Sequence, residues 1–253
     1  MTALRVARAD RFVTVTIDRP PVNALTAALC DDIRRLFTDL SSDESTSCVI
    51  LTGAGTRAFC AGLDFHDFLE MVDADAEAKN AIVREMYSSV YHCSLPVVAA
   101  VNGPALGAGA VLASVCDIRI ASSAASFRLP EVDVGRIGGA AHIGRLVPQG
   151  ALRRLVFTGS AVSSIEAARI GLVDQIAAAD ALDAARDVAV TIASKSPLGL
   201  RYAKQSLNEI EALPFEEGYR REQAANIAYR RTEDAKEATR AAVQKRPPQF
   251  KGR

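Results

Sequence analysis

The composition of this 253-residue chain limits the classes of protein to which it can belong. Thirty lysines and arginines balance thirty aspartates and glutamates, so we expect neither nucleic acid nor an anionic membrane surface as a partner. A hydrophobic fraction of 49% is enough to bury a substantial core. The five cysteines form no Cys-x-x-Cys pair, and the N-terminus lacks the apolar core of a signal peptide, which together favour a reducing cytoplasm.

The first fifty residues predict two strands, a helix and a third strand. Arg11–Asp18 alternates apolar and polar residues like a half-buried strand, and Leu4–Ala7 can pair with it as a hairpin. Thr26 is a suitable N-cap for the amphipathic helix that follows. The apolar face of that helix contains Leu29, Ile33, Leu36, Phe37 and Leu40. Val49–Thr52 then predicts a short buried strand, and this order of elements indicates an α/β architecture.

The segment Ser94–Asp117 is the one around which the rest of the chain is organised. Pro96–Val101 predicts a buried strand, and Asn102–Pro104 predicts the turn that ends it. Leu106–Ala113 is made of small, helix-compatible residues, so another group can approach the backbone where the helix begins. The first N–H groups of a helix have no partner within it and can receive an anion or a developing oxyanion. We therefore interpret this segment as half of an active site.

Three other interpretations of the same segment have to be weighed. Leu95–Cys116 is uncharged and long enough to span a bilayer, but the Asn-Gly-Pro turn argues against one continuous helix. The glycine spacing imitates the dinucleotide-binding turn of short-chain dehydrogenases, yet it lies in mid-chain and no Tyr-x-x-x-Lys pair accompanies it. The glycines can also serve only the close packing of a helix on a strand.

Gly53–Asp67 predicts a second unusual loop. Arg57 supplies a cation there, and Ala61–Leu63 exposes backbone N–H groups on small residues. One N–H from this loop and the N–H of Ala108 can converge on one carbonyl oxygen as an oxyanion hole, in which each donor contributes about 3 kcal/mol of transition-state stabilisation. The alternative is an ordinary glycine turn without a ligand.

Glu131 is the candidate acid or base. It follows Pro130 among apolar neighbours, after a predicted strand at Ser126–Leu129. Desolvation in such surroundings raises the pKa of a carboxyl group towards the range that is useful for proton transfer. The alternative is a glutamate on a solvated loop.

Taken together, these motifs make the chain resemble the crotonase superfamily, the enoyl-CoA hydratase/isomerase group, over nearly its whole length. The segments that carry the resemblance are Pro21–Leu25, Arg57–Asp64, Pro96–Leu112, Phe127–Gly135, Thr158–Gly159, Ala167–Asp174 and Glu233–Arg253. The resemblance implies an α/β fold, a spiral of ββα units with a C-terminal helical region used in trimer contacts. It also implies a homotrimer or a hexamer, no prosthetic group, and coenzyme A as part of an acyl thioester substrate.

The resemblance also assigns roles to individual residues. The oxyanion donors would be the N–H groups of Leu63 and Ala108, with Glu131 as the acid or base. Coenzyme A would run along Arg57–Phe65, with Arg57 on a phosphate. Other expected coenzyme A contacts are Leu25, Ala61, Leu63, Asp64, Phe65 and, reaching a neighbouring subunit's ligand, Lys251.

The chain departs from the hydratase pattern at Val111, where enoyl-CoA hydratases carry a second glutamate. Hydration needs a base for water and an acid for the α-carbon, whereas one glutamate is enough to move a proton in an isomerase. A 2-enoyl-CoA hydratase, a Δ3-Δ2-enoyl-CoA isomerase, an aryl-acyl-CoA hydratase-lyase and a non-catalytic acyl-CoA-binding relative therefore all stay open. His142 either joins the pocket wall as an extra acid or base, or packs as a structural residue. Neither a metal site at Asp64–Asp67 nor a nucleophilic Cys60 is expected.

The remainder of the chain predicts mainly helices. The expected helical ranges are Glu77–Tyr91, Gly150–Phe157, Ser164–Arg169, Ala179–Ala193, Leu198–Ile210, Phe215–Ala228 and Glu233–Gln244. Further strands are expected at Asp117–Ala121 and Leu172–Asp174. No linker separates these helices from the core, so we expect an α/β core over residues 1–195 and a helical region over residues 196–253.

Overall fold

The computed structural model of the protein describes residues 3–69 and 73–253, and its largest sheet has six strands in the order β1-β2-β3-β4-β6-β9. These strands are β1 (Leu4–Ala9), β2 (Phe12–Ile17), β3 (Cys48–Gly53), β4 (Val97–Val101), β6 (Ile118–Ala121) and β9 (Gln175–Ile176). The first pair is an antiparallel hairpin, as predicted, and the other neighbours are parallel. An α/β architecture is therefore confirmed.

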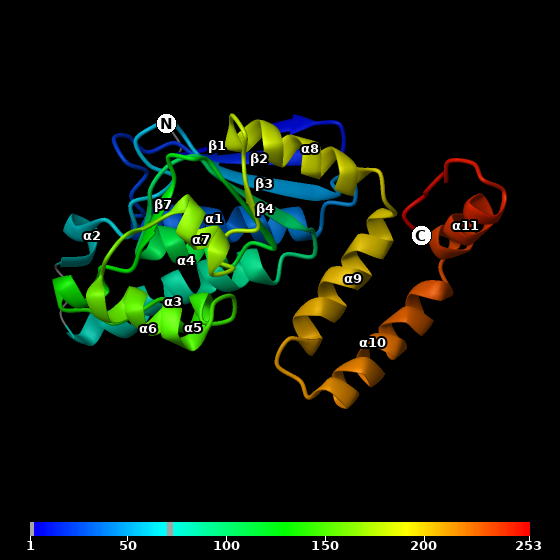
Figure 1. Ribbon diagram of the computed structural model, residues 1–253. Helices are drawn as coiled ribbons and strands as arrows, with labels where there is room; N and C mark the ends of the chain where they lie inside the picture. Colours follow the sequence, from blue (N-terminus) through cyan, green and yellow to red (C-terminus); the bar gives the residue numbers. More distant parts are fainter. Residues whose placement is uncertain (1–2, 70–72) are drawn as a thin grey trace.

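Helices cover both faces of this sheet, which explains why its central strands β3 and β4 are buried throughout. On one face, residues such as Val49 and Leu51 pack in a large core with α1 (Ala27–Ser41) and α3 (Asp73–Tyr91). On the other face, Cys48 and Ile50 pack against the small side chains of α8 (Ala181–Ala193). Figure 1 shows α8 above the sheet and α1 beneath it. Alternate residues of each strand thus serve opposite layers.

The N-terminus of α1 confirms a local prediction. Thr26 has extended backbone angles, and its hydroxyl accepts a hydrogen bond from Leu29 N at 3.2 Å. The capped helix buries the predicted apolar face, with Ile33 and Phe37 fully enclosed. A helix start satisfied by a side chain and an apolar stripe facing the sheet are both readable from local sequence.

A second, smaller sheet and a set of short helices follow β4. The strands are β5 (Ala105–Leu106), β7 (Ser126–Arg128) and β8 (Val162–Ser163). The helices of this part are α2 (Phe65–Leu69), α4 (Ala108–Ser114), the 3-10 helix η1 (Glu131–Val134), α5 (Ala140–Ile143), α6 (Gln149–Thr158) and α7 (Ser164–Arg169). Together they surround the start of α4.

The prediction of a strand at Leu172–Asp174 is wrong, because the last strand is Gln175–Ile176. The N–H groups of Leu172 and Val173 both donate to the carbonyl of Ala167 and so close the end of α7. Their side chains are buried, which produces the same apolar pattern as a strand.

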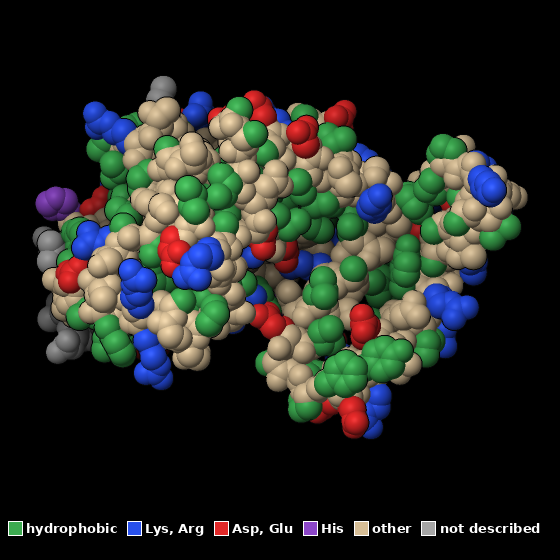
Figure 2. Space-filling view, viewed as in Figure 1, with side chains coloured by type: hydrophobic (Ala, Val, Ile, Leu, Met, Phe, Trp, Pro, Cys, Tyr) green, Lys and Arg blue, Asp and Glu red, His purple; other side chains and the backbone are tan. Residues whose placement is uncertain are grey.

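The C-terminal helices α9 (Pro197–Ile210), α10 (Phe215–Arg230) and α11 (Glu233–Val243) extend to one side of the body as an arm (Figure 1). Apolar side chains remain exposed on this arm, and Figure 2 shows them on the outer surface of α10. The exposed apolar residues of the arm include Phe215, Tyr219 and Ile227 of α10 and Val243 of α11. In the described part of the chain, no helix is both long and apolar enough to cross a bilayer.

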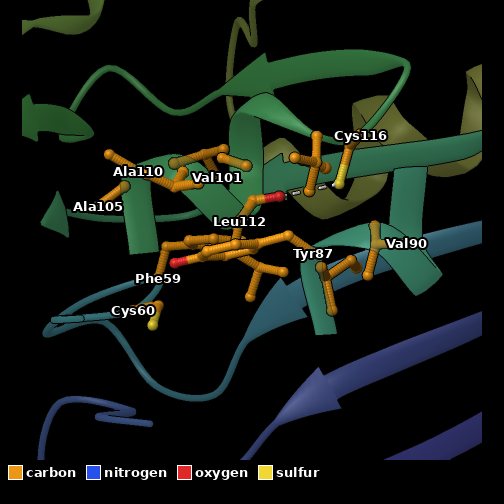
Figure 3. Packing of buried hydrophobic residues seen from close by; sticks show 14 of the residues in the cluster. Phe59, Cys60, Tyr87, Val90, Val101, Ala105, Ala110, Leu112 and Cys116 are labelled. Atoms are coloured by element: carbon orange, nitrogen blue, oxygen red, sulfur yellow. Dashed lines mark hydrogen bonds between the residues drawn. The ribbon is translucent and has the colours of Figure 1, made fainter. Parts of the chain in front are cut away.

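All five cysteines are buried and carry free thiols. Burial raises the pKa of Cys30, Cys48, Cys60 and Cys116 to about 12. Figure 3 shows Cys60 and Cys116 within the packed core, where the Cys116 thiol donates to the carbonyl of Leu112. The cysteines therefore act as small core residues.

Candidate active site

The loop after β3 and the start of α4 are held together by main-chain hydrogen bonds. Cys60 pairs with Ala105 in a β-bridge, and Leu106 N donates to the carbonyl of Cys60 at 3.0 Å. On the other side of the loop, Leu25 N donates to Gly62 O at 2.8 Å. Asp64 N in turn donates to Leu25 O, also at 2.8 Å. The main chain, rather than side-chain packing, thus fixes the path of Cys60–Asp64.

Two glycines allow this close approach. A side chain at Gly109 would place its Cβ 2.1 Å from Cys60 O, and one at Gly62 would lie 2.8 Å from Leu106 O. Gly62 also has φ of 94°, a conformation that L side chains rarely adopt. A larger residue at either position would push the loop away from α4.

The approach brings two free donors to the same place. A Cβ built on Gly62 would lie 3.4 Å from the N atom of Ala108, the first residue of α4. The peptide between Gly62 and Leu63, which carries the Leu63 N–H, is therefore a neighbour of Ala108. Within residues 3–69 and 73–253, neither Leu63 N–H nor Ala108 N–H has an acceptor. Ala108 is buried and Leu63 half-buried, and a ligand oxygen would satisfy both amides.

Both residues line a cavity of about 430 Å³. Its wall comes from the loop after β3, from α3, from the start of α4 and from the segment between η1 and α5. The described residues that line it are Ala61, Gly62, Leu63, Phe65, Asn80, Val83, Tyr87, Gly107, Ala108, Val111, Pro130, Glu131, Val134, Arg136, Ile137, Gly138, Gly139 and His142. Elements distant in sequence therefore share one hollow.

Glu131 reaches this cavity from the first position of η1. Its Oε1 lies against Gly107, where an added Cβ would be 2.9 Å away. Its Oε2 is buried and, among the described residues, finds no hydrogen-bond partner. Burial is the main cause that raises the pKa of Glu131 above its ordinary value. A desolvated carboxyl of this kind is suited to exchange a proton with a bound molecule.

His142 of α5 and Tyr87 of α3 form another part of the wall. Their ring centroids are 5.1 Å apart, and the Tyr87 hydroxyl donates to the carbonyl of Ala108 at 3.2 Å. Figure 3 shows Tyr87 packed with Phe59 and Leu112. The His142 Nδ1 is buried without a partner among the described residues, and burial, followed by the charge of Arg145, lowers the pKa of the ring. His142 is thus a neutral imidazole at pH 7.

The structure distributes the expected coenzyme A contacts unevenly. Ala61, Leu63 and Phe65 line the cavity, and Phe65 is exposed at its edge. Asp64 lies beside them and forms an ion pair with Arg19 at 2.7 Å. The roles of these residues in binding stay predictions.

Three of the other expected contacts lie outside the cavity wall. Leu25 is fully buried and touches the loop through its backbone, while Arg57 is exposed. Lys251 belongs to the C-terminal tail, where its N–H donates to Asp234 at 2.7 Å. Their predicted contacts with coenzyme A, including that of Lys251 with a neighbouring subunit's ligand, stay predictions.

The sequence analysis did not single out Tyr87, Arg136 or Asn80 as cavity residues. Tyr87 lies at helical spacing among apolar neighbours, so its pattern is that of packing. Only the hydroxyl directed at Ala108 O reveals its connection to the site. Val111, by contrast, lines the cavity as an apolar side chain that is 3% exposed. Among the described residues, no group of three or more His, Cys, Asp or Glu could hold a metal ion.

Comparison with known proteins identifies the class to which this fold and cavity belong. The sequence model described as enoyl-CoA hydratase/isomerase matches residues 8–253. The crystal structure of an enoyl-CoA hydratase from Bacillus anthracis superposes with a TM-score of 0.94 at 31% identity, covering 99% of this chain and 100% of that one. The crotonase fold is therefore confirmed.

Curated relatives point the same way. A short-chain-enoyl-CoA hydratase from Clostridium acetobutylicum is 34% identical over 93% of this chain and 92% of its own length. A (7aS)-7a-methyl-1,5-dioxo-2,3,5,6,7,7a-hexahydro-1H-indene-carboxyl-CoA hydrolase from Mycobacterium tuberculosis is 38% identical over 84% of this chain and 86% of its own length. The chain belongs to the enoyl-CoA hydratase/isomerase family, in the crotonase superfamily.

Proposed function

We propose that the protein binds an acyl-CoA thioester in this cavity and stabilises its enolate. The thioester oxygen accepts hydrogen bonds from Leu63 N–H and Ala108 N–H, and Glu131 moves a proton at the α-carbon. The observation that supports this most is the presence, around one cavity, of two amide donors and one carboxyl oxygen that all lack partners among the described residues. The oxygen of the enolate would satisfy the amides, and the proton removed from the α-carbon of the thioester would pass to the carboxylate.

The two amides supply the larger part of the expected catalysis. Negative charge develops on the thioester oxygen when the α-proton leaves, and fixed donors in a water-poor site stabilise that charge by about 3 kcal/mol each. The hydrogen bonds that hold Cys60–Asp64 in place mean that the donors need little rearrangement during reaction. Coenzyme A would lie along Arg57–Phe65, with the Arg57 cation near a phosphate.

The experiment follows exchange of the α-proton of butyryl-CoA for deuterium in heavy water by NMR. This reaction needs an enolate and one base, without an added water. Glu131→Gln keeps the shape of the side chain and removes its proton transfer, so exchange should fall by a factor on the order of 10² to 10⁴. Glu44→Gln, at an exposed glutamate of another surface, is the control. Unchanged exchange in Glu131→Gln would remove Glu131 from the mechanism.

The apolar Val111 favours a second candidate within the same chemistry. A single carboxyl can take a proton from the α-carbon of a 3-enoyl thioester and return it to the γ-carbon, which is a Δ3-Δ2-enoyl-CoA isomerisation. Assays with 2-enoyl, 3-enoyl and 3-hydroxyacyl thioesters, including an aromatic acyl group, separate isomerase, hydratase and hydratase-lyase. Binding of acyl-CoA in calorimetry without exchange or turnover would indicate a non-catalytic acyl-CoA-binding protein.

We also propose a homotrimer, alone or paired as a hexamer, in the cytoplasm. The apolar side chains exposed on the arm support self-association, because contiguous exposed apolar surface marks interfaces. The free thiols are consistent with a reducing compartment. Light scattering during size-exclusion chromatography gives the mass, and a monomer at micromolar concentration would contradict the assembly.

A further inference from the structure

His142 lies where two hollows of the protein meet. A second cavity of about 510 Å³ lies between α3, α5 and the end of α9, and His142 and Tyr87 line both this cavity and the one that contains Glu131. Exposed residues such as Arg84 and Arg145 form the edge of the second cavity. One imidazole can therefore face a bound acyl group on one side and solvent on the other.

His142 and Glu131 are the two described side chains of the first cavity that offer an acid or base group without a hydrogen-bond partner. Burial raises the pKa of Tyr87 well above 10, and its hydroxyl is already bonded to Ala108 O. Val111 carries no proton to exchange. The cavity thus holds one carboxyl and one imidazole on different elements, η1 and α5.

The surroundings of His142 suit a base. Its Nδ1 is buried without a partner among the described residues, a state that costs free energy unless a bound molecule satisfies it. The Tyr87 ring packs on it, and the hydroxyl of the same tyrosine donates to the carbonyl of Ala108, so the imidazole is held near the residue whose N–H is a proposed oxyanion donor.

Burial, followed by the positive charge of Arg145 behind the ring, keeps His142 neutral. Arg145 lies 4.5 Å from the centre of the Tyr91 ring and pairs with Glu211 at 2.5 Å. Its positive charge opposes protonation of His142. A neutral imidazole with an open nitrogen accepts a proton, whereas an imidazolium would not.

We propose that His142 is a catalytic base that activates water for addition to a 2-enoyl thioester, with Glu131 as the acid. Water gives a proton to His142 as its oxygen bonds to the β-carbon. The π electrons move to the thioester oxygen, held by the two amides, and Glu131 then protonates the α-carbon to give a 3-hydroxyacyl thioester. The imidazolium releases its proton to water in the second cavity, and the carboxylate takes one up. This inference rests on the proposed function and makes the reaction a hydration.

The test compares two reactions in the same variants. Hydration of short and medium 2-enoyl-CoAs, followed by loss of enoyl absorbance, needs both groups, whereas α-proton exchange of butyryl-CoA needs Glu131 and the amides. In His142→Gln, which still forms hydrogen bonds, hydration should fall by a factor on the order of 10² to 10⁴ while exchange is retained. Glu44→Gln, at an exposed glutamate of another surface, is again the control.

Each other outcome overturns the inference. Equal losses of hydration and exchange would show that His142 only supports the site, and unchanged hydration would show that it takes no part. A wild-type protein that exchanges the α-proton but hydrates none of the thioesters would also refute it, while leaving the proposed function standing. Loss of exchange in Glu131→Gln tests that function separately.

Discussion

The cavity and the arm are held in place by different kinds of interaction. Around the cavity, main-chain hydrogen bonds and close-packed glycines fix Cys60–Asp64 against α4. The arm is attached instead by charged side chains. Lys204 of α9, 4% exposed, pairs with Asp117, and Arg201 donates to the carbonyl of Ser41 at 2.5 Å. The cavity loop is held by main-chain hydrogen bonds, and the arm is held by a few charged side chains.

At the end of the chain, one buried carboxylate holds the C-terminal tail through hydrogen bonds. Asp234, 1% exposed, accepts hydrogen bonds from Ser196 Oγ at 2.8 Å, from Lys251 N at 2.7 Å and from Gly252 N at 3.0 Å. Helix α10 buries only Gly218 among its described residues. Substitutions near the cavity should therefore change the reaction, and substitutions beneath the arm should change stability.

Of the substitutions that test this difference, Gly107→Ala should cause the largest loss, a loss of catalytic rate. The new Cβ would lie 2.9 Å from Glu131 Oε1, and it would displace the carboxyl from its place beside the cavity. Displacing a catalytic group by about 1 Å can lower the rate roughly 100-fold, so we expect α-proton exchange to fall by about that factor. Gly107 has φ of 50°, so the control needs similar backbone strain. Gly55→Ala provides it, with φ of 72° and open space around the Cβ, and should retain exchange.

Asp117→Asn should destabilise the protein without changing the chemistry. Lys204 would keep a buried charge without its anion, which should lower the free energy of unfolding by about 3 kcal/mol in urea titrations. Asp183→Asn, which breaks an exposed pair with Arg186, should change it little. Exchange per folded molecule should match the wild type in both variants. A loss of exchange in Asp117→Asn at full folding would contradict the separation of the two regions.

Glu131→Gln should stabilise the fold in a pH-dependent way. The folded protein raises the pKa of Glu131 above 4.5, so it binds that proton more tightly than the unfolded chain, and the ionised form destabilises the fold. Above the raised pKa, Glu131→Gln should therefore unfold at a higher temperature than the wild type. The difference should vanish as pH falls below 4.5. The titratable or charged described residues that share the cavity with Glu131 are Arg136, Tyr87 and His142, and the cavity residues of α4 are uncharged.

Sequence reasoning predicted those parts of the molecule that local patterns determine. The hairpin, the Thr26 cap and the buried strand before α4 all follow from periodicity and turn residues, and the structure confirms them. The gathering of Leu63, Ala108 and Glu131 at one cavity was expected from the order of motifs, although their roles stay predictions.

The same reasoning was less informative where distant residues decide the outcome. Leu172 and Val173 are apolar, and this pattern predicted a strand. In the structure both side chains are buried, but the N–H groups close the end of α7. The contact of Tyr87 with Ala108 and His142 joins three elements, and no local pattern predicts it. The course of the arm depends on Lys204 meeting Asp117, 87 positions earlier. Such pairings are visible only once the chain is folded.

The five free thiols all lie between Cys30 and Cys116, within the body, and the arm has none. A maleimide added to the native protein would react only when that body opens, because burial shields every sulfur. Labelling kinetics would consequently time the opening of the sheet and its helices, while remaining blind to detachment of α9–α11. Proteolysis of the arm, run in parallel, would show whether the two events share one cooperative transition.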